Sequence, residues 1–191
     1  MIRVATVDIQ AMTPYCPSKH YVVEKIGRET HADYETRTWR ERMHYDEKGS
    51  VFIPAMAFKN SLQGAASFLG KKIPGRAQKT FAAFFKAAVL VMEGLDLQVQ
   101  KSSVPGEQFF VPSDGKTGGG TRVMKTFARI EGWGGKVQFI VSDETITKEV
   151  FEEHIKAAGA FVGLGRFRPE RGGFYGRFRV NNIQWSAMDD Y

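Results

Sequence analysis

Arginines alternate with glycines and aromatic residues between residues 159 and 180, in the stretch GAFVGLGRFRPERGGFYGRFRV. Arginine guanidinium groups bind phosphates through paired hydrogen bonds, and aromatic faces stack on nucleic-acid bases. Glycine permits positive φ angles and lets a backbone come close to a ligand. The stretch therefore predicts a nucleic-acid surface, and the alternative is a glycine-rich β-hairpin with a solvated basic face. The predicted phosphate contacts are Arg166, Arg168, Arg171, Arg177 and Arg179, and the predicted stacking residues are Phe174 and Tyr175.

Histidines and carboxylates in residues 15–50 are candidates for acid–base chemistry. One of His20, His31 and His44 would serve as general acid or base in RNA cleavage, or Asp33 would help to hold a divalent metal. Their spacing singles out no pair, and the alternative is a solvated polar loop. The histidines show no metal-ligand spacing, and a lone cysteine, Cys16, excludes a cysteine-based zinc site. We therefore predict no resident metal and keep catalysis as the less favoured hypothesis.

Two nucleotide-binding patterns are incomplete. GKT at residues 115–117 lacks the glycine that a phosphate-binding loop needs five positions earlier, where Phe110 stands. GLGRFR at 163–168 ends in arginine and follows a predicted helix, whereas a dinucleotide-binding fingerprint follows a strand. No cofactor is therefore expected.

The totals favour a single basic domain. The chain has 191 residues, a net charge of +6 and a sequence pI near 9.4, which suits one domain, 1–191, with a polyanion partner. The start, MIRVATVDIQ, lacks the pattern of a signal peptide, and no apolar run approaches the roughly 20 residues that span a bilayer. We expect a cytoplasmic protein with no membrane partner.

Periodicity predicts the elements that must position these residues. Strands are expected over residues 2–12, over 88–100 with a bend at Gly94, and over 174–185, with a hairpin over 122–142. Helices are expected after Pro54 up to Gly70, and from Thr145 or Thr147 to about residue 160. Segments 15–50 and 101–121 are insertions, and 36–44 is expected to form one arm of a β-hairpin that turns at 46–49.

The order strand, helix, strand, strand, helix, strand predicts an α+β fold. This is the β-α-β-β-α-β pattern of a ferredoxin-like or RRM-like core, here with inserted hairpin loops. Such a core has an antiparallel sheet with helices on one face, and the other face is left free for single-stranded nucleic acid.

Two motifs in this order resemble the CRISPR-associated RAMP superfamily, particularly its Cas7-type backbone subunits. VFIPAMAFKNSLQGAAS resembles the family's helix start, I-P-G-S-S-[IL]-K-G-x-[LI]-R, although Asn60 and Ser61 follow the lysine here. GLGRFRPERGGFYGRF resembles the glycine-rich loop that the family places between the second helix and the final strand of its core. The residues that carry the first likeness are Ile53, Pro54, Phe58, Lys59, Leu62 and Gly64.

The resemblance implies a protein that binds a single-stranded guide RNA and assembles side by side along it, with other CRISPR-type effector subunits. Lys59, Asn60 and Gln63 would contact the RNA, and 15–50 would contact a neighbouring subunit. The insert at 101–121 would be a thumb-like hairpin with Phe109 and Phe110 wedged between bases, although a small satellite core beneath the loop is equally expected of these rings.

Three hypotheses follow. The first is a non-catalytic RNA-binding protein that forms a homo-oligomer or filament. The second is a RAMP-type endoribonuclease, because some Cas7-type subunits cut RNA with an aspartate in the segment that holds Asp33. The third is a single-stranded-DNA-binding or inhibitory protein of viral origin.

Overall fold

A four-stranded antiparallel sheet forms the centre of the fold. The computed structural model describes residues 2–113 and 120–188. The sheet contains β1 (Arg3–Ala11), β3 (Val89–Val91), β7 (Gly134–Val141) and β8 (Phe178–Ala187), in the order β3-β7-β1-β8. All its pairings are antiparallel, with Val7 of β1 opposite Val137 on one side and Ile183 on the other. The α+β class predicted from the sequence is confirmed.

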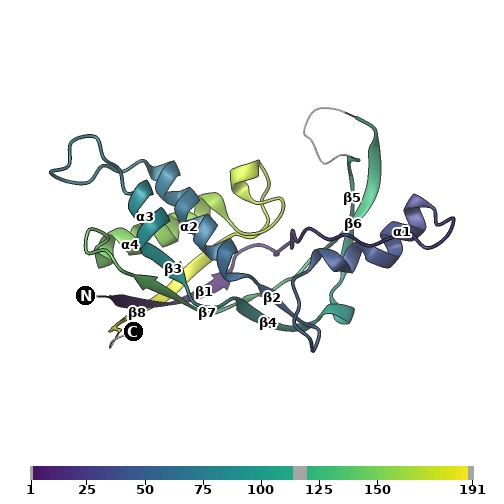
Figure 1. The fold of residues 1–191 in the computed structure, drawn as a ribbon, viewed down its shortest axis with the longest axis horizontal. Helices are drawn as coiled ribbons and strands as arrows, with labels where there is room; N and C mark the ends of the chain where they lie inside the picture. Colours follow the sequence, from purple (N-terminus) through teal and green to yellow (C-terminus); the bar gives the residue numbers. More distant parts are fainter. Residues whose placement is uncertain (1, 114–119, 189–191) are drawn as a thin grey trace.

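Helices cover one face of this sheet (Figure 1). They are α2 (Ala55–Leu69), α3 (Ala82–Ala88) and α4 (Lys148–Ala157), and α4 continues into a π-helical turn, η3 (Ala158–Val162). The predicted helix α2 is confirmed. Three local signals explain why it could be predicted: Pro54 precedes it, apolar residues repeat at helical spacing, and Gly70 ends it in a left-handed conformation.

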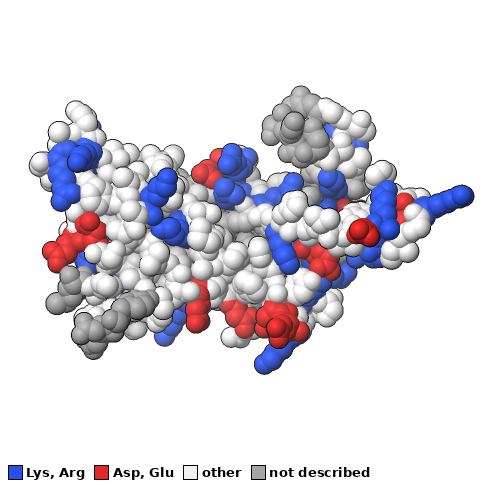
Figure 2. Space-filling view, viewed as in Figure 1, with Lys and Arg blue, Asp and Glu red and all other residues white. Residues whose placement is uncertain are grey.

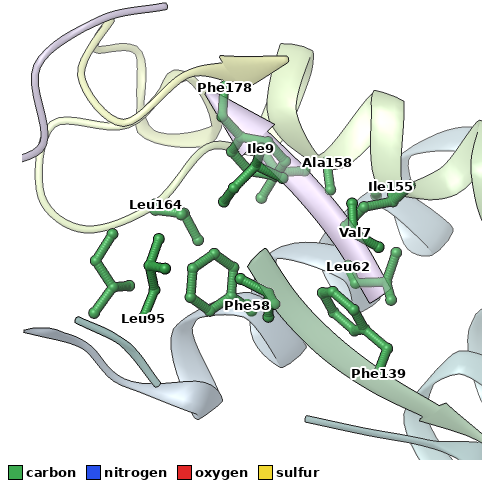
Figure 3. Close-up of a cluster of buried hydrophobic side chains, with 14 of the residues drawn as sticks. Val7, Ile9, Phe58, Leu62, Leu95, Phe139, Ile155, Ala158, Leu164 and Phe178 are labelled. Atoms are coloured by element: carbon green, nitrogen blue, oxygen red, sulfur yellow. The ribbon is translucent and has the colours of Figure 1, made fainter. Parts of the chain in front are cut away.

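The core lies between these helices and the sheet. Alternate residues of β1 point inward, so Ala5, Val7 and Ile9 are buried. Figure 3 shows Val7 and Ile9 facing side chains of α2 and α4, including Leu62 and Ile155. Each large apolar side chain buried here stabilises the fold by about 1.5–3 kcal/mol.

The middle of the opposite face of the sheet is polar, although Val4, Ile140 and Leu90 lie side by side nearer one end of it. Its register places Thr6 between Gln138 and Gln184, and Asp8 between Lys136 and Asn182. The aromatic residues of these strands, Phe139, Phe178 and Trp185, belong to the inward-facing set. The open face therefore lacks the aromatic rings on which an RRM-like sheet stacks bases.

The remaining elements extend from one end of the sheet (Figure 1). A short ladder joins β2 (Ser50–Ile53) to β4 (Leu95–Gln100), and a hairpin joins β5 (Gly106–Pro112) to β6 (Arg122–Ala128). The helix α1 (His31–Thr38), which continues as the 3-10 helix η1 (Trp39–Arg42), lies beside this hairpin. Two short 3-10 turns, η2 (Lys101–Ser103) and η4 (Pro169–Arg171), complete the fold.

Three sequence predictions about these elements are wrong. Residues 122–142 do not form one hairpin, because β6 pairs with β5 whereas β7 pairs with β1 and β3. The expected bent strand over 88–100 is two strands in different sheets, β3 and β4. Residues 36–44 are largely helical rather than a strand arm, although the turn after them is present, with Gly49 N donating to Asp46 O at 3.0 Å. Alternation indicates a strand but cannot name its partner.

Candidate nucleic-acid interface

The two motifs noted in the sequence meet in one groove. It lies between the start of α2 and residues 163–171, has a volume of about 330 Å³, and is called the α2–loop groove here. Asn60 and Ser61 line one wall, and Arg168 and Glu170 line the other. Residues more than 100 positions apart in the chain therefore form a single polar recess.

Glycines let the loop pack against the rest of the chain. Gly165 has a φ of +72°, and a Cβ there would lie 2.2 Å from the carbonyl oxygen of Cys16. The neighbouring backbone N–H, that of Arg166, donates to the same carbonyl at 2.7 Å. The close approach that glycine permits is thus made to the protein's own backbone at this position.

Arg168 lines the groove, and Arg171 follows Glu170, which also lines it. Arg168 donates from Nε and Nη2 to the Glu170 carboxylate at 3.0 and 2.7 Å, and from Nη1 to the Gly165 carbonyl at 3.0 Å. Arg171 reaches the same carboxylate only at 3.9 Å, and its side chain is 73% exposed. Arg171 is therefore the readiest of the five arginines to take a phosphate, with Arg168 beside it.

The other three arginines point elsewhere. Arg166 is half-buried, with its guanidinium 4.7 Å from the ring centre of Phe127, and burial lowers its pKa. Arg177 donates to the Ala160 carbonyl at 2.9 Å. Arg179 lies on the open face of the sheet and binds the side chain of Gln10 there. The five arginines thus do not form one surface.

The predicted contacts from α2 are also divided. Asn60 is exposed and lines the α2–loop groove, and Gln63 is partly buried one turn along the helix. Lys59 donates to the carbonyl of Lys86 at 2.8 Å and to that of Val89, and burial lowers its pKa. Lys59 therefore holds the junction between α3 and β3, and it is already occupied.

Two of the predicted stacking rings belong to a small satellite core at the base of the hairpin. Phe109 packs against Phe127 and Phe167 at centroid distances of 5.9 and 5.1 Å. Tyr175 is buried, and its hydroxyl donates to Glu107 at 2.5 Å; burial and this carboxylate raise its pKa. Phe109 is thus partly buried against the other rings of this cluster, which agrees with the satellite-core alternative for Phe109.

The other two predicted rings are open to solvent. Phe110 is 57% exposed near the outer part of the hairpin, and the Arg122 guanidinium lies 5.5 Å from its ring centre. Phe174 is 56% exposed in the glycine–arginine stretch. These two remain available for stacking.

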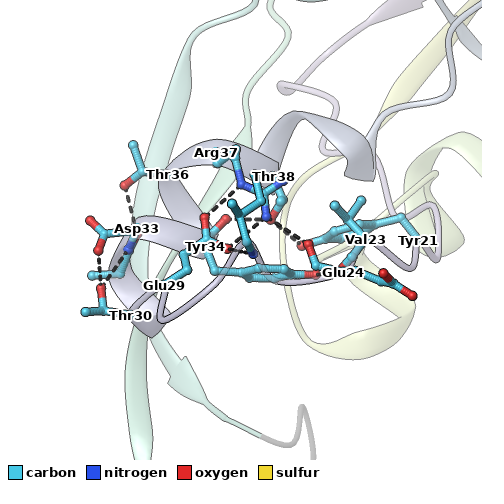
Figure 4. Close-up of polar contacts among 12 residues, drawn as sticks. Tyr21, Val23, Glu24, Glu29, Thr30, Asp33, Tyr34, Thr36, Arg37 and Thr38 are labelled. Carbon is cyan, nitrogen blue, oxygen red and sulfur yellow. Dashed lines mark hydrogen bonds and ion pairs between the residues drawn. The ribbon is translucent and has the colours of Figure 1, made fainter.

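The acid–base candidates lie apart from one another. Figure 4 shows Asp33 in a cap of α1, where its N–H donates to Thr30 Oγ1 at 3.2 Å and its carboxylate accepts from that hydroxyl at 2.6 Å. His31 lines a second groove, of about 660 Å³, between α1 and the hairpin. His44 lines the α2–loop groove, where burial and Lys19 lower its pKa, and His20 is exposed. Among the described residues no group of three or more His, Cys, Asp or Glu side chains could hold a metal.

One important pair was missed in the sequence. Arg42 donates to both carboxylate oxygens of Glu35 at 2.7 and 2.9 Å, and to the Thr126 carbonyl at 2.7 Å. The Thr126 N–H returns a bond to Glu35 at 2.8 Å. Burial alone would raise the pKa of Glu35, but the hydrogen bonds from Arg42 and Thr126 outweigh this effect and lower the pKa. The pair fixes α1 and η1 to β6, and nothing in the local sequence names Thr126 as the third member.

Comparisons with known proteins bear on the fold. No protein-family model matches the sequence, and no curated protein matches it. A chain in the structure of the type III-B Cmr-beta bound to cognate target RNA aligns over 96% of this chain at 14% identity, with a TM-score of 0.52. Cmr6 from Pyrococcus furiosus aligns over 94% of this chain and 99% of its own at 13% identity, with a TM-score of 0.50.

These alignments show a shared fold. The chain spans 60% of the length of the first neighbour. Within residues 2–113 and 120–188, no helix has the length and apolar character needed to cross a membrane.

Proposed function

We propose that this protein is a RAMP-type, CRISPR-associated subunit that binds single-stranded guide RNA and assembles side by side along it. One observation carries the proposal: both motifs that resemble the RAMP superfamily line the α2–loop groove, on a fold shared with Cmr structures. The proposed role is binding, with no cleavage.

The RNA backbone would pass through the α2–loop groove. Arg168 and Arg171 would bind its phosphates, and the Asn60 amide would hydrogen-bond to a phosphate or ribose. The Arg168–Glu170 pair is partly exposed, so exchanging the carboxylate for a phosphate costs little. Lys59, Arg166 and Arg177 would act indirectly, by holding the elements that form the groove.

We further infer a ferredoxin-like core. The sheet order β3-β7-β1-β8, with α2 between β1 and β3 and α4 between β7 and β8, supports this assignment. The α1–hairpin region would then be an insertion available to a neighbouring subunit, with Phe110 as its exposed ring.

Salt-dependent binding tests the proposal. Fluorescence anisotropy with labelled single-stranded RNA, at several salt concentrations, should give a steep slope of log affinity against log salt, since phosphate contacts release counterions. The double variant R168Q/R171Q should reduce the slope by about 1.4, at about 0.7 for each lost contact to a single strand. The control is K48Q, an exposed lysine in the turn between Tyr45 and Val51, which should leave the slope unchanged.

Other outcomes would favour the remaining hypotheses. A flat salt response of the wild-type protein contradicts RNA binding and favours an inhibitory protein that docks on an acidic partner. Equal or tighter binding to single-stranded DNA favours the DNA-binding form. Cleavage of labelled RNA that is lost in H44A, the histidine in the groove, contradicts a purely binding role.

A further inference from the structure

Two exposed phenylalanine rings lie together on the outer side of the helical layer. Phe68 of α2 is 63% exposed and Phe161 of η3 is 52% exposed. Their ring centroids are 5.1 Å apart with an interplanar angle of 28°, which is a stacked arrangement. Leaving two rings in water forgoes the stabilisation that burial would give, so the pair invites a ligand with a flat apolar face.

The pair is in line with the α2–loop groove. Asn60, Gly64 and Phe68 repeat every four residues on one face of α2, which places them about 6 Å apart along the helix axis. Asn60 lines the groove, and a Cβ on Gly64 would lie 3.1 Å from Val162 and 3.4 Å from Glu170. Phe68 therefore lies about one helical turn beyond Gly64, the α2 residue that faces Glu170 of the loop.

Basic residues lie at both ends of this line. Arg168 lines the groove, with Arg171 three residues further along the loop, and Lys71 and Lys72 follow Gly70, which caps the end of α2. Lys71 pairs with Glu153 at 2.5 Å between two half-exposed side chains, a pair that exchanges readily with solvent. Figure 2 shows blue atoms over both ends, at the 71–80 loop and at the loop that holds η4, where red atoms lie beside them.

We propose that Phe68 and Phe161 form a stacking platform for a base of a single-stranded nucleic acid whose phosphates run along α2, from Arg168 and Arg171 to Lys71 and Lys72. This inference rests on the proposed function and adds a base contact outside the two motifs. Aromatic rings flanked by cations are the arrangement that binds single strands without reading their sequence.

A protein partner fits this patch less well. A stable interface buries about 800 Å² on each side, far more than two rings provide. The neighbouring α2 residues Gln63 and Ser67 are polar. The four cations at the two ends of the line outnumber the two carboxylates paired with them, Glu170 and Glu153. Charge complementarity therefore favours a polyanion over an apolar surface.

The experiment uses the double variant F68L/F161L, which keeps apolar bulk and removes both rings. Its affinity for a single-stranded RNA should fall about tenfold, the loss expected for one stacked base. The salt slope should not change, because stacking releases no counterions. On a strand of abasic nucleotides the variant and the wild type should bind equally. L90A, an exposed apolar change on β3, is the control and should bind like the wild type, and urea unfolding should show that both variants fold.

Each outcome separates the two proposals. If the wild type binds RNA with a steep salt slope and F68L/F161L binds equally well, the platform is overturned and the proposed function stands. If the wild type binds no single strand, both are overturned. If the variant lowers the assembly mass in light scattering and its loss persists on the abasic strand, the rings form a protein interface and the platform is overturned.

Discussion

The base of the hairpin and the outer side of α2 use charge in opposite ways. At the hairpin base, Arg42 and Glu35 are largely buried, and both also bond to the backbone of Thr126. Along α2, the pairs Arg168–Glu170 and Lys71–Glu153 lie partly in solvent. A buried pair fixes the position of an element, whereas an exposed pair can exchange its carboxylate for a phosphate. A basic sequence stretch therefore predicts a ligand only where its cations remain in solvent.

Breaking the buried pair should have the largest effect. In Arg42→Met the Glu35 carboxylate loses its partner while partly buried, so the free energy of unfolding should fall by about 3 kcal/mol. Urea unfolding measures this loss. The control is Lys156→Met, which removes the pair of Lys156 with Glu152 on α4, where both side chains are at least half exposed and the midpoint should barely change. Equal losses in the two variants would contradict the distinction between buried and exposed pairs.

Two glycines of the glycine–arginine loop, Gly165 and Gly172, extend the comparison between packed and solvent-exposed positions. In Gly165→Ala the new methyl group would meet the Cys16 carbonyl at a φ of +72°, and the cost should be about 3 kcal/mol. Gly172 has a similar φ of +76°, but a Cβ there would meet nothing within 4 Å, so Gly172→Ala should cost only about 1 kcal/mol. Thermal unfolding of the two variants compares them. If they are equally stable, the close contact at Gly165 plays no part in holding the loop.

The smallest effect is expected from a buried histidine on the α2 side. His154 donates from Nδ1 to the Val150 carbonyl at 2.6 Å and stacks on Phe85, and its buried Nε2 has no partner among the described residues. Burial lowers its pKa below the usual value of about 6.5. As pH falls below about 6.5 the unfolded chain gains a proton that the folded chain does not. The free energy of unfolding should therefore fall, by at most about 1.4 kcal/mol per pH unit, down to the folded pKa.

The variant His154→Phe tests this dependence. Phenylalanine keeps the stack on Phe85 but cannot bind a proton, so the slope of stability against pH between pH 7 and 5 should become shallower. Urea midpoints at each pH provide the measurement. A change at the exposed His20 to glutamine is the control. An unchanged slope in His154→Phe would mean that other groups set the acid sensitivity.

Local signals in the sequence predicted local structure. The start and end of α2 follow from Pro54 and Gly70. The cap of α1 also has a local signal, since Thr30 and Asp33 have the spacing of a capping box. Pairings across long sequence distances could not be predicted in this way. That β6 pairs with β5 is a property of the tertiary fold. The partial burial of Phe109, which packs against Phe127 and Tyr175, is another.

The same limit applies to the candidate site. The sequence identifies the helix start and the glycine–arginine loop as separate motifs. Only the fold brings Asn60 and Arg168 to the same groove. The different directions of Arg166, Arg171 and Arg179 could not be read from their spacing. The Phe68–Phe161 pair was missed because its two rings come from different helices.

The pairing of β1 with β8 also affects how the chain is made. β1 is complete at Ala11, but one of its two neighbours ends at Ala187, so more than 170 further residues must be synthesised before that ladder is complete. Until then the growing chain carries a strand with one unpaired edge, a known template for aggregation. Because the outward side chains of β1 are mostly polar, that waiting strand is better protected than an apolar one would be.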